Sequence, residues 1–112
     1  TSLGFRFSQN KGNHLENFVA IELKRREKEF YYHKENFECD FVIKENLKII
    51  EAIQVCFDLN EKNEKREFDG LLEAMKKFNL KKGIILTYDQ DRELNFENKT
   101  VIVKPVWKWL LE

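Results

Sequence analysis

Residues 38–58 constrain the fold of this chain more than any other stretch. Two runs rich in β-branched and aromatic residues, 38–44 and 48–57, flank the polar pair Glu45-Asn46. Such a pattern is typical of two antiparallel strands joined by a tight turn. We therefore expect a β-hairpin at the centre of the fold.

Asp40 interrupts the apolar side chains of the first strand of this hairpin. Because side chains alternate across a strand, Cys39 and Phe41 are predicted to share one face, with Asp40 on the other. A carboxylate in such surroundings must be paired, metal-bound or solvated in a cleft, since burying it bare is costly. Two interpretations stay open for Asp40: a buried salt bridge with His14 or Arg25, or a site for metal or phosphate.

The composition is that of one soluble domain over residues 1–112. Twenty basic and twenty acidic residues cancel, which excludes a strongly basic nucleic-acid-binding surface at the level of net charge. No apolar run approaches the roughly 20 residues that span a bilayer, so we expect a cytoplasmic protein without a membrane partner. The first residue is Thr1 rather than Met, and we expect a piece of a longer protein or a processed chain.

The two cysteines, Cys39 and Cys56, lie on adjacent predicted strands without the spacing of a zinc site. In a chain rich in Lys and Glu they are expected to be free thiols packed in the core, as in a reducing compartment. A zinc site that combines them with His14 and His33 is the less favoured alternative.

Hydrophobic periodicity predicts the remaining elements. The first helix is expected from Asn13 to about Lys28, with Asn13 as its N-cap and Glu16 in the capping-box position. Residues 84–88 form a continuous apolar run, which favours a strand buried on both faces beside a parallel neighbour. The other expected elements are a strand at 30–33, a helix at 65–78, edge strands at 93–96 and 100–103, and a last helical turn after Pro105.

Two carboxylates of the first helix lie close to its apolar side. At about 100° per residue, Glu16 falls at the edge of the apolar stripe and Glu22 falls nearer the centre. Glu16 is either a helix cap or a ligand of a site, and Glu22 is expected to pair with an arginine.

These positions together indicate a possible chemistry. A Glu on a first helix, an Asp on a central strand, and an acid followed two residues later by Lys on the next strand suit metal-dependent phosphodiester hydrolysis. The carboxylates hold Mg²⁺ by hard oxygen ligands, the ion activates water and neutralises phosphate charge, and the Lys steadies the nucleophile. Here Glu16 and Asp40 occupy the first two positions, and antiparallel pairing sets Gln54 beside Asp40.

The chain resembles the C-terminal domain of unknown function that many archaeal and bacterial AAA+ ATPases carry. The resemblance rests on residues 12–26, 31–33, 38–42 and 53–55, and extends to the strand at 83–88 and the closing segment 105–110. That domain is similar to the restriction-endonuclease-like PD-(D/E)XK fold, which implies an α/β class with a mixed central sheet flanked by helices.

The resemblance also implies a site. Its catalytic residues would be Asp40, Gln54 and Glu16, and Mg²⁺ or Mn²⁺ would be held by Glu16, Asp40, Gln54 and the Val55 carbonyl. It implies further that an ATPase domain precedes this one in the same chain.

Two departures from the family pattern bear on activity. Gln54 stands where the second acid should be, which removes a negative charge, and Cys56 stands where the Lys should be. A thiol has no fixed positive charge and is a poor partner for Mg²⁺. Lys44 lies roughly 13 Å along the strand from Asp40, so Lys65 and Arg66 at the start of the second helix are the candidates for a replacement cation.

We therefore expect a nuclease-like domain with a degenerate active site that binds nucleic acid, with DNA the candidate. The alternative is a non-catalytic regulatory or protein-interaction module of an ATPase. Self-association is also open. If the domain binds nucleic acid, two basic clusters are expected to contact its phosphates. If it does not, the same clusters are solvated helix ends. Their residues are Lys24, Arg25, Arg26, Lys76 and Lys77.

Overall fold

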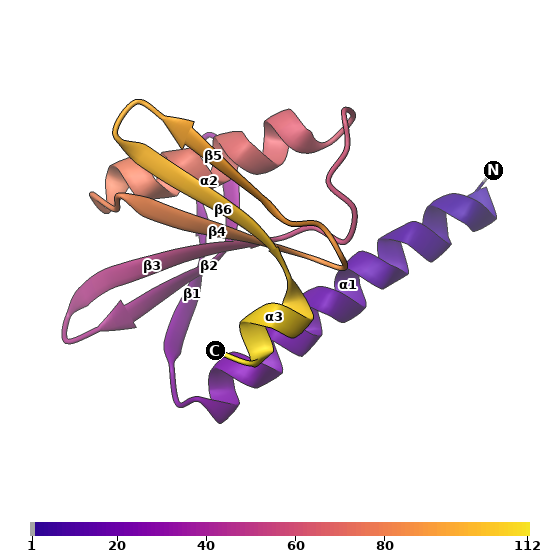
Figure 1. Cartoon of the computed structure of the whole chain (residues 1–112). Coiled ribbons are helices and arrows are strands. Elements are labelled where there is room, and N and C mark those ends of the chain that lie inside the picture. Colours follow the sequence, from indigo (N-terminus) through magenta and orange to yellow (C-terminus); the bar gives the residue numbers. More distant parts are fainter. Residues whose placement is uncertain (1) are drawn as a thin grey trace.

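The computed structural model describes the backbone of residues 2–112 and the side chains of residues 11–112. Six strands form one sheet in the order β1-β2-β3-β4-β6-β5, and helices cover both of its faces (Figure 1). The elements are α1 (Ser2–Arg25), β1 (Glu29–Lys34), β2 (Glu38–Glu45), β3 (Lys48–Val55), α2 (Glu64–Lys77), β4 (Lys82–Thr87), β5 (Arg92–Phe96), β6 (Lys99–Pro105) and α3 (Val106–Leu110).

The sheet is mixed, as expected for the α/β class. Strands β1, β2 and β3 are antiparallel, which confirms the central hairpin, whereas β3, β4 and β6 run parallel. Helix α2 makes the crossover from β3 to β4, so the buried apolar strand β4 has the parallel neighbour that its sequence predicts. The expectation that 100–103 is an edge strand is wrong, because β6 lies between β4 and β5 and buries Val101 and Val103.

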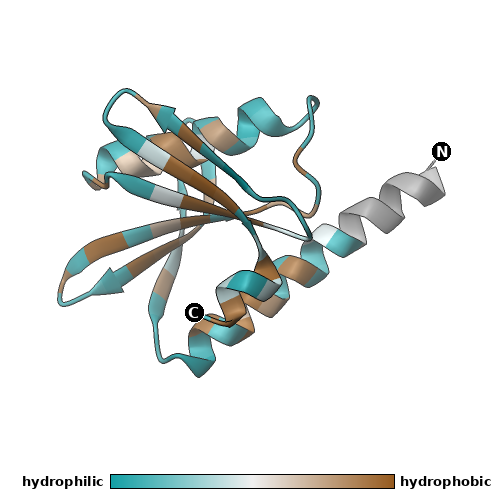
Figure 2. Ribbon diagram, in the orientation of Figure 1, coloured by the Kyte–Doolittle hydropathy of each residue, from teal (hydrophilic) through white to brown (hydrophobic). Residues whose placement is uncertain are grey.

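The two faces of the sheet carry separate apolar clusters, and hydrophobic residues recur along the strands and the helices (Figure 2). One cluster joins α1 and α3 to the sheet through residues such as Val19, Ile53 and Trp109. The other packs α2 on the opposite face through Leu71 and Met75. The fold is thus three layers with the sheet in the middle. In the described part of the chain no helix is long and apolar enough to cross a membrane.

Helix α1 begins earlier than expected. It starts at Ser2, so Asn13 lies inside the helix and is not its N-cap, and Glu16 has no capping-box role. The helix ends at Arg25 rather than near Lys28. Two residues after this end, Glu27 adopts a positive φ of 59°. The Lys28 N–H then bonds the Leu23 carbonyl and the Glu27 N–H bonds the Lys24 carbonyl, which is the Schellman pattern of a helix end.

A β-bulge in β2 changes which residues share a face. Between the pairs Tyr31–Val42 and His33–Cys39, β2 has two residues, Asp40 and Phe41, where β1 has only Tyr32. The alternation breaks there, so Cys39 packs in the α2 cluster while Phe41 packs in the α1 cluster. The prediction that Cys39 and Phe41 share a face is therefore wrong.

Close packing of α2 against the sheet depends on Gly70. A Cβ at this position would lie 1.9 Å from the Glu38 carbonyl oxygen and 2.7 Å from the Gln54 Nε2. Only a residue without a side chain allows the helix to approach the ends of β2 and β3 this closely.

We expect Gly70→Ala to lower the free energy of unfolding by roughly 1–3 kcal/mol, because the added methyl collides with backbone. Gly12→Ala is the matched control, since a Cβ there meets no described atom within 4 Å. That variant should be neutral or more stable by up to about 1 kcal/mol through helix propensity. Urea unfolding of the two variants measures the contrast, and equal stability would contradict it.

Candidate functional site

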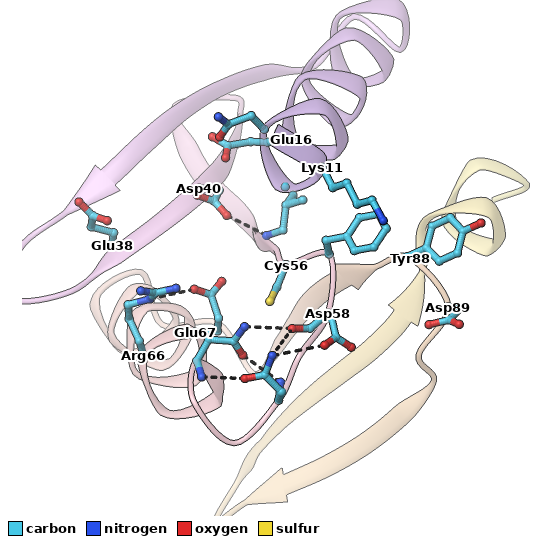
Figure 3. A pocket seen from close by; sticks show the side chains of 16 residues that line it. Lys11, Glu16, Glu38, Asp40, Cys56, Asp58, Arg66, Glu67, Tyr88 and Asp89 are labelled. Atoms are coloured by element: carbon cyan, nitrogen blue, oxygen red, sulfur yellow. Dashed lines mark hydrogen bonds and ion pairs between the residues drawn. The ribbon is translucent and has the colours of Figure 1, made fainter. Parts of the chain in front are cut away.

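A pocket of about 710 Å³ lies where β2 begins and β3 ends, between α1 and the first turns of α2 (Figure 3). Its described lining holds six carboxylates and two basic side chains. The acidic residues are Glu16, Glu38, Asp40, Asp58, Glu67 and Asp89, and the basic ones are Lys11 and Arg66. Such an excess of negative charge favours a cation over an anion inside the pocket.

Two hydrogen bonds at the end of the β2–β3 pairing fix Asp40 in this pocket. Regular backbone pairing of the two strands stops at Phe41 and Ile53. Past this pair, Asp40 Oδ2 accepts the Val55 N–H at 2.8 Å, and the Asp40 N–H donates to Gln54 Oε1 at 2.8 Å. Side chains thus replace backbone partners on both strands.

The Asp40 carboxyl is strongly perturbed. Its pKa is raised to about 7, chiefly by burial and in addition by the negative charges of Glu16, Glu67 and Glu38, while the Val55 N–H acts in the opposite direction. A carboxylate perturbed by burial and by like charges in a cleft is typical of functional sites, although structural networks also produce such shifts. Arg25, one of the partners considered for Asp40, is bonded instead to Glu22.

Gln54 lies beside Asp40, as the strand pairing predicts, but its amide is engaged with backbone. The side chain is 2 % exposed. While Oε1 accepts from Asp40, Nε2 donates to the carbonyls of Glu38 at 2.8 Å and Glu67 at 3.1 Å. Gln54 therefore braces β2, β3 and α2 together. Its role as a metal ligand stays a prediction, and its oxygen would have to share or release the Asp40 N–H.

Cys56 lines the pocket as a neutral thiol. Burial raises its pKa to about 12, and the charge of Glu67 adds to the rise. Burial raises the pKa of Cys39 to about 12 as well. Both cysteines are free and buried, as predicted. No positive charge comes from the position where the family pattern has Lys.

Two further acids approach Asp40 from the two helix layers. Burial raises the pKa of Glu16 on α1, and Glu38 adds to this rise. Burial also raises the pKa of Glu67 on α2, against the opposing effect of Arg66. Glu16 thus lines the same pocket as Asp40, and its role as a ligand stays a prediction. Glu67 was not predicted as a residue of this pocket. The charged side of α2 carries several acids, and the angle at which the helix packs on the sheet determines which of them faces the pocket.

Of the two candidates for a replacement cation, only one lies at the pocket. Arg66 is part of its lining, and its Nε lies 3.3 Å from Glu67 Oε2. Lys65 is bonded to Asp69 at 2.8 Å, outside the lining.

The basic residues predicted to contact phosphate are not brought to the pocket. Arg25 and Arg26 both bond to Glu22, which confirms the expected Glu22–Arg pairing. Arg26 also donates to the Trp109 carbonyl at 3.0 Å and lies over its ring. The remaining members lie at the C-terminal ends of α1 and α2, where Lys77 pairs with Glu35. These ends are roughly 12–15 Å along each helix from the residues that line the pocket.

The donor chemistry of the pocket suits a hard divalent cation, since Mg²⁺ and Mn²⁺ prefer carboxylate oxygens. Among the described residues, no three His, Cys, Asp or Glu side chains converge as a metal site. A zinc site of histidines and cysteines is therefore not formed there. Mg²⁺ commonly uses one or two carboxylates together with water, so Asp40 with one neighbouring acid is a sufficient set.

Comparison with known proteins gives a family but no activity. The family described as "Domain of unknown function (DUF4143)" matches residues 11–109. The "Uncharacterized protein MJ1544" of Methanocaldococcus jannaschii is 40 % identical over 119 residues, covering 94 % of this chain. This chain spans only 26 % of the length of that relative. No solved structure matches the chain significantly.

We expect the stability of the protein to rise as the pH falls from about 7 to about 4. The pKa of Asp40 is about 7 in the folded protein against an ordinary 3.8. In this range the folded state therefore binds a proton that the unfolded state lacks. Asp40→Asn should remove part of this slope and add roughly 1–3 kcal/mol at pH 8.

Urea unfolding between pH 4 and 8 measures the slope. Glu45→Gln, at the exposed far end of the same strand, is the control and should keep the wild-type profile. An unchanged profile for Asp40→Asn would show that this carboxyl is not the perturbed group.

We expect Arg26 to act in folding rather than in phosphate binding. Arg26→Ala removes the ion pair with Glu22 and both contacts with Trp109. It should lower the melting temperature by roughly 5 °C. Lys24→Ala, at an exposed position on the same helix, should leave it unchanged. Calorimetry of both variants measures the two melting temperatures. An Arg26→Ala variant that keeps the wild-type melting temperature but binds nucleic acid more weakly would contradict this expectation.

Proposed function

The chain belongs to the family "Domain of unknown function (DUF4143)", and we propose that in this member it forms a nuclease-like domain. It would bind Mg²⁺ or Mn²⁺ at Asp40 and engage the phosphodiester backbone of nucleic acid, DNA being the first candidate. The observation that carries the proposal is Asp40 itself. Its buried carboxyl is held by the Val55 N–H at the base of a pocket lined by further acids.

The order of elements supports this proposal. A helix, three antiparallel strands, a second helix and a parallel strand follow one another along the chain. The resemblance to the restriction-endonuclease-like PD-(D/E)XK fold implies this arrangement. In that fold the acid of the central strand and the residues of the next strand meet at one end of the sheet, as Asp40 and Val55 do here.

The residues of the chain would prepare the site as follows. A bound divalent cation supplies charge neutralisation on phosphate and a more acidic water molecule. The Val55 N–H holds Oδ2 of Asp40, which limits the rotation of the carboxyl group. Glu16 faces the same pocket from α1. The acids repel a bare phosphate, so a nucleic acid would enter only together with the cation.

A second candidate is a non-catalytic interaction module, and a specific observation favours it. The Gln54 amide is bonded to three backbone groups, and Cys56 is a buried neutral thiol. Neither residue supplies the charge that the family pattern requires. In both candidates the domain would work beside an ATPase domain of a longer protein, which accords with the small share of the M. jannaschii relative that it spans.

We expect labelled single-stranded, duplex or branched DNA to be cut in the presence of Mg²⁺ or Mn²⁺ but not of EDTA. Asp40→Asn keeps an acceptor for the Val55 N–H but removes the charge, and should lower the rate at least about 100-fold. Glu45→Gln, prepared in parallel, should cut like the wild type. Absence of cutting by all three proteins would reject catalysis and leave the interaction module.

A further inference from the structure

We propose that Glu67 and Arg66, at the start of α2, supply the acid and the cation that Gln54 and Cys56 lack. This inference rests on the proposed function and names two further residues of the same site. The acid would be the second carboxylate for the divalent cation, and the guanidinium would contact the phosphate. Both roles would then have moved from strand β3 to the helix that crosses its end.

Glu67 points into the pocket although it lies on a helix with many solvated charges. Its side chain is only 13 % exposed. Figure 3 shows its carboxylate directed toward Cys56, on the side of the pocket where Asp40 lies. Asp40, Cys56 and Glu67 line the same pocket, and the negative charge of Glu67 contributes to the raised pKa of the other two groups. A carboxylate here fills the place beside Asp40 that position 54 leaves without charge.

The backbone of α2 is held so that Glu67 keeps this position. The Gln54 Nε2 donates to the Glu67 carbonyl at 3.1 Å, which ties the first turn of α2 to β3. One turn later, Gly70 allows contact with the Glu38 carbonyl that any side chain would prevent. Gln54, which stands where the family pattern has an acid, therefore holds the turn of α2 that carries Glu67.

Arg66 has the exposure that a phosphate contact requires. Its side chain is 74 % exposed at the mouth of the pocket, and its Nε lies 3.3 Å from Glu67 Oε2. The planar guanidinium can bind two phosphate oxygens at once and stays charged at any ordinary pH. Arg66 and Cys56 line the same pocket, so the guanidinium lies in the pocket that a Lys at position 56 would also line.

A simpler role for Glu67 is that of an acid stabilising the N-terminal end of α2. Glu64 provides the matched control, because it lies in the same first turn and outside the pocket lining. It pairs loosely with Arg92 at 3.7 Å. Glu64→Gln and Glu67→Gln remove the same charge from the same helix end, but only one of them touches the proposed site.

The experiment is calorimetric titration of the whole chain with Mn²⁺, in the absence of nucleic acid. We expect Glu67→Gln to weaken Mn²⁺ binding about 10-fold or more, comparable to Asp40→Asn. Glu64→Gln should stay within about twofold of the wild type. Circular dichroism confirms that each variant is folded, and Glu67→Asp, which keeps the charge on a shorter side chain, should retain part of the affinity.

Arg66 is tested by a different readout. Arg66→Gln should leave Mn²⁺ affinity within about threefold of the wild type but weaken the binding of a labelled DNA measured with Mn²⁺ present. Arg66→Lys should restore part of that loss, because it keeps the charge without the planar fork.

The outcomes separate this inference from the proposed function. Mn²⁺ binding that is lost in Asp40→Asn but kept in Glu67→Gln would overturn the role of Glu67 and leave the proposed function standing. DNA affinity unchanged in Arg66→Gln would overturn the role of Arg66. A wild-type chain that binds no Mn²⁺ would overturn both the inference and the proposed function.

Discussion

The bulge at Asp40 and Phe41 is the constraint on which the candidate site depends. With two residues opposite Tyr32, β2 loses its alternation at the point where its regular pairing with β3 stops. Backbone groups left without ladder partners must find others, because unpaired buried N–H groups are costly. The Asp40 carboxylate and the Gln54 amide supply them. The site thus begins as a solution to a backbone problem at the end of two strands.

That solution places a charge where the surroundings oppose it. Burial and three neighbouring acids raise the pKa of Asp40 to about 7, so the ionised form destabilises the folded chain at neutral pH. A structure that only had to fold would gain by placing an amide or an apolar residue at position 40. A divalent cation relieves the repulsion among the acids, which is the physical reason that such a cluster indicates a binding site.

The sequence predicts the fold better than it predicts the site. Hydrophobic periodicity predicts the strands and α2 to within about two residues at each end, and the apolar run at 84–88 predicts a parallel neighbour, which the structure confirms. The start of α1 was wrong because Asn13 has the chemistry of a cap in a sequence that remains helical before it. The faces of β2 were wrong because alternation holds only without a bulge, and a bulge depends on pairing with another strand.

Glu67 shows a different limit of prediction. Glu64 and Glu73 lie on the same helix, and the order of residues along the chain does not show which of the three acids faces the pocket. The burial of Glu67 follows from the close contact at Gly70, which joins residues of β2, β3 and α2. Residues brought together by such packing are visible only when the angle of the helix on the sheet is known. Glu16, by contrast, could be found from its place at the edge of an apolar stripe.

The hydrogen bonds of Gln54 also explain why an acid at position 54 would be unfavourable in this fold. The Gln54 Nε2 faces two carbonyl oxygens, those of Glu38 and Glu67. A carboxylate there would offer no donor to either and would repel both, in a place that is 2 % exposed. Helix α2 would have to move away, and Glu67 would move with it. The Gln54 amide therefore holds the backbone of the first turn of α2 against β3, and with it the position from which the Glu67 side chain extends.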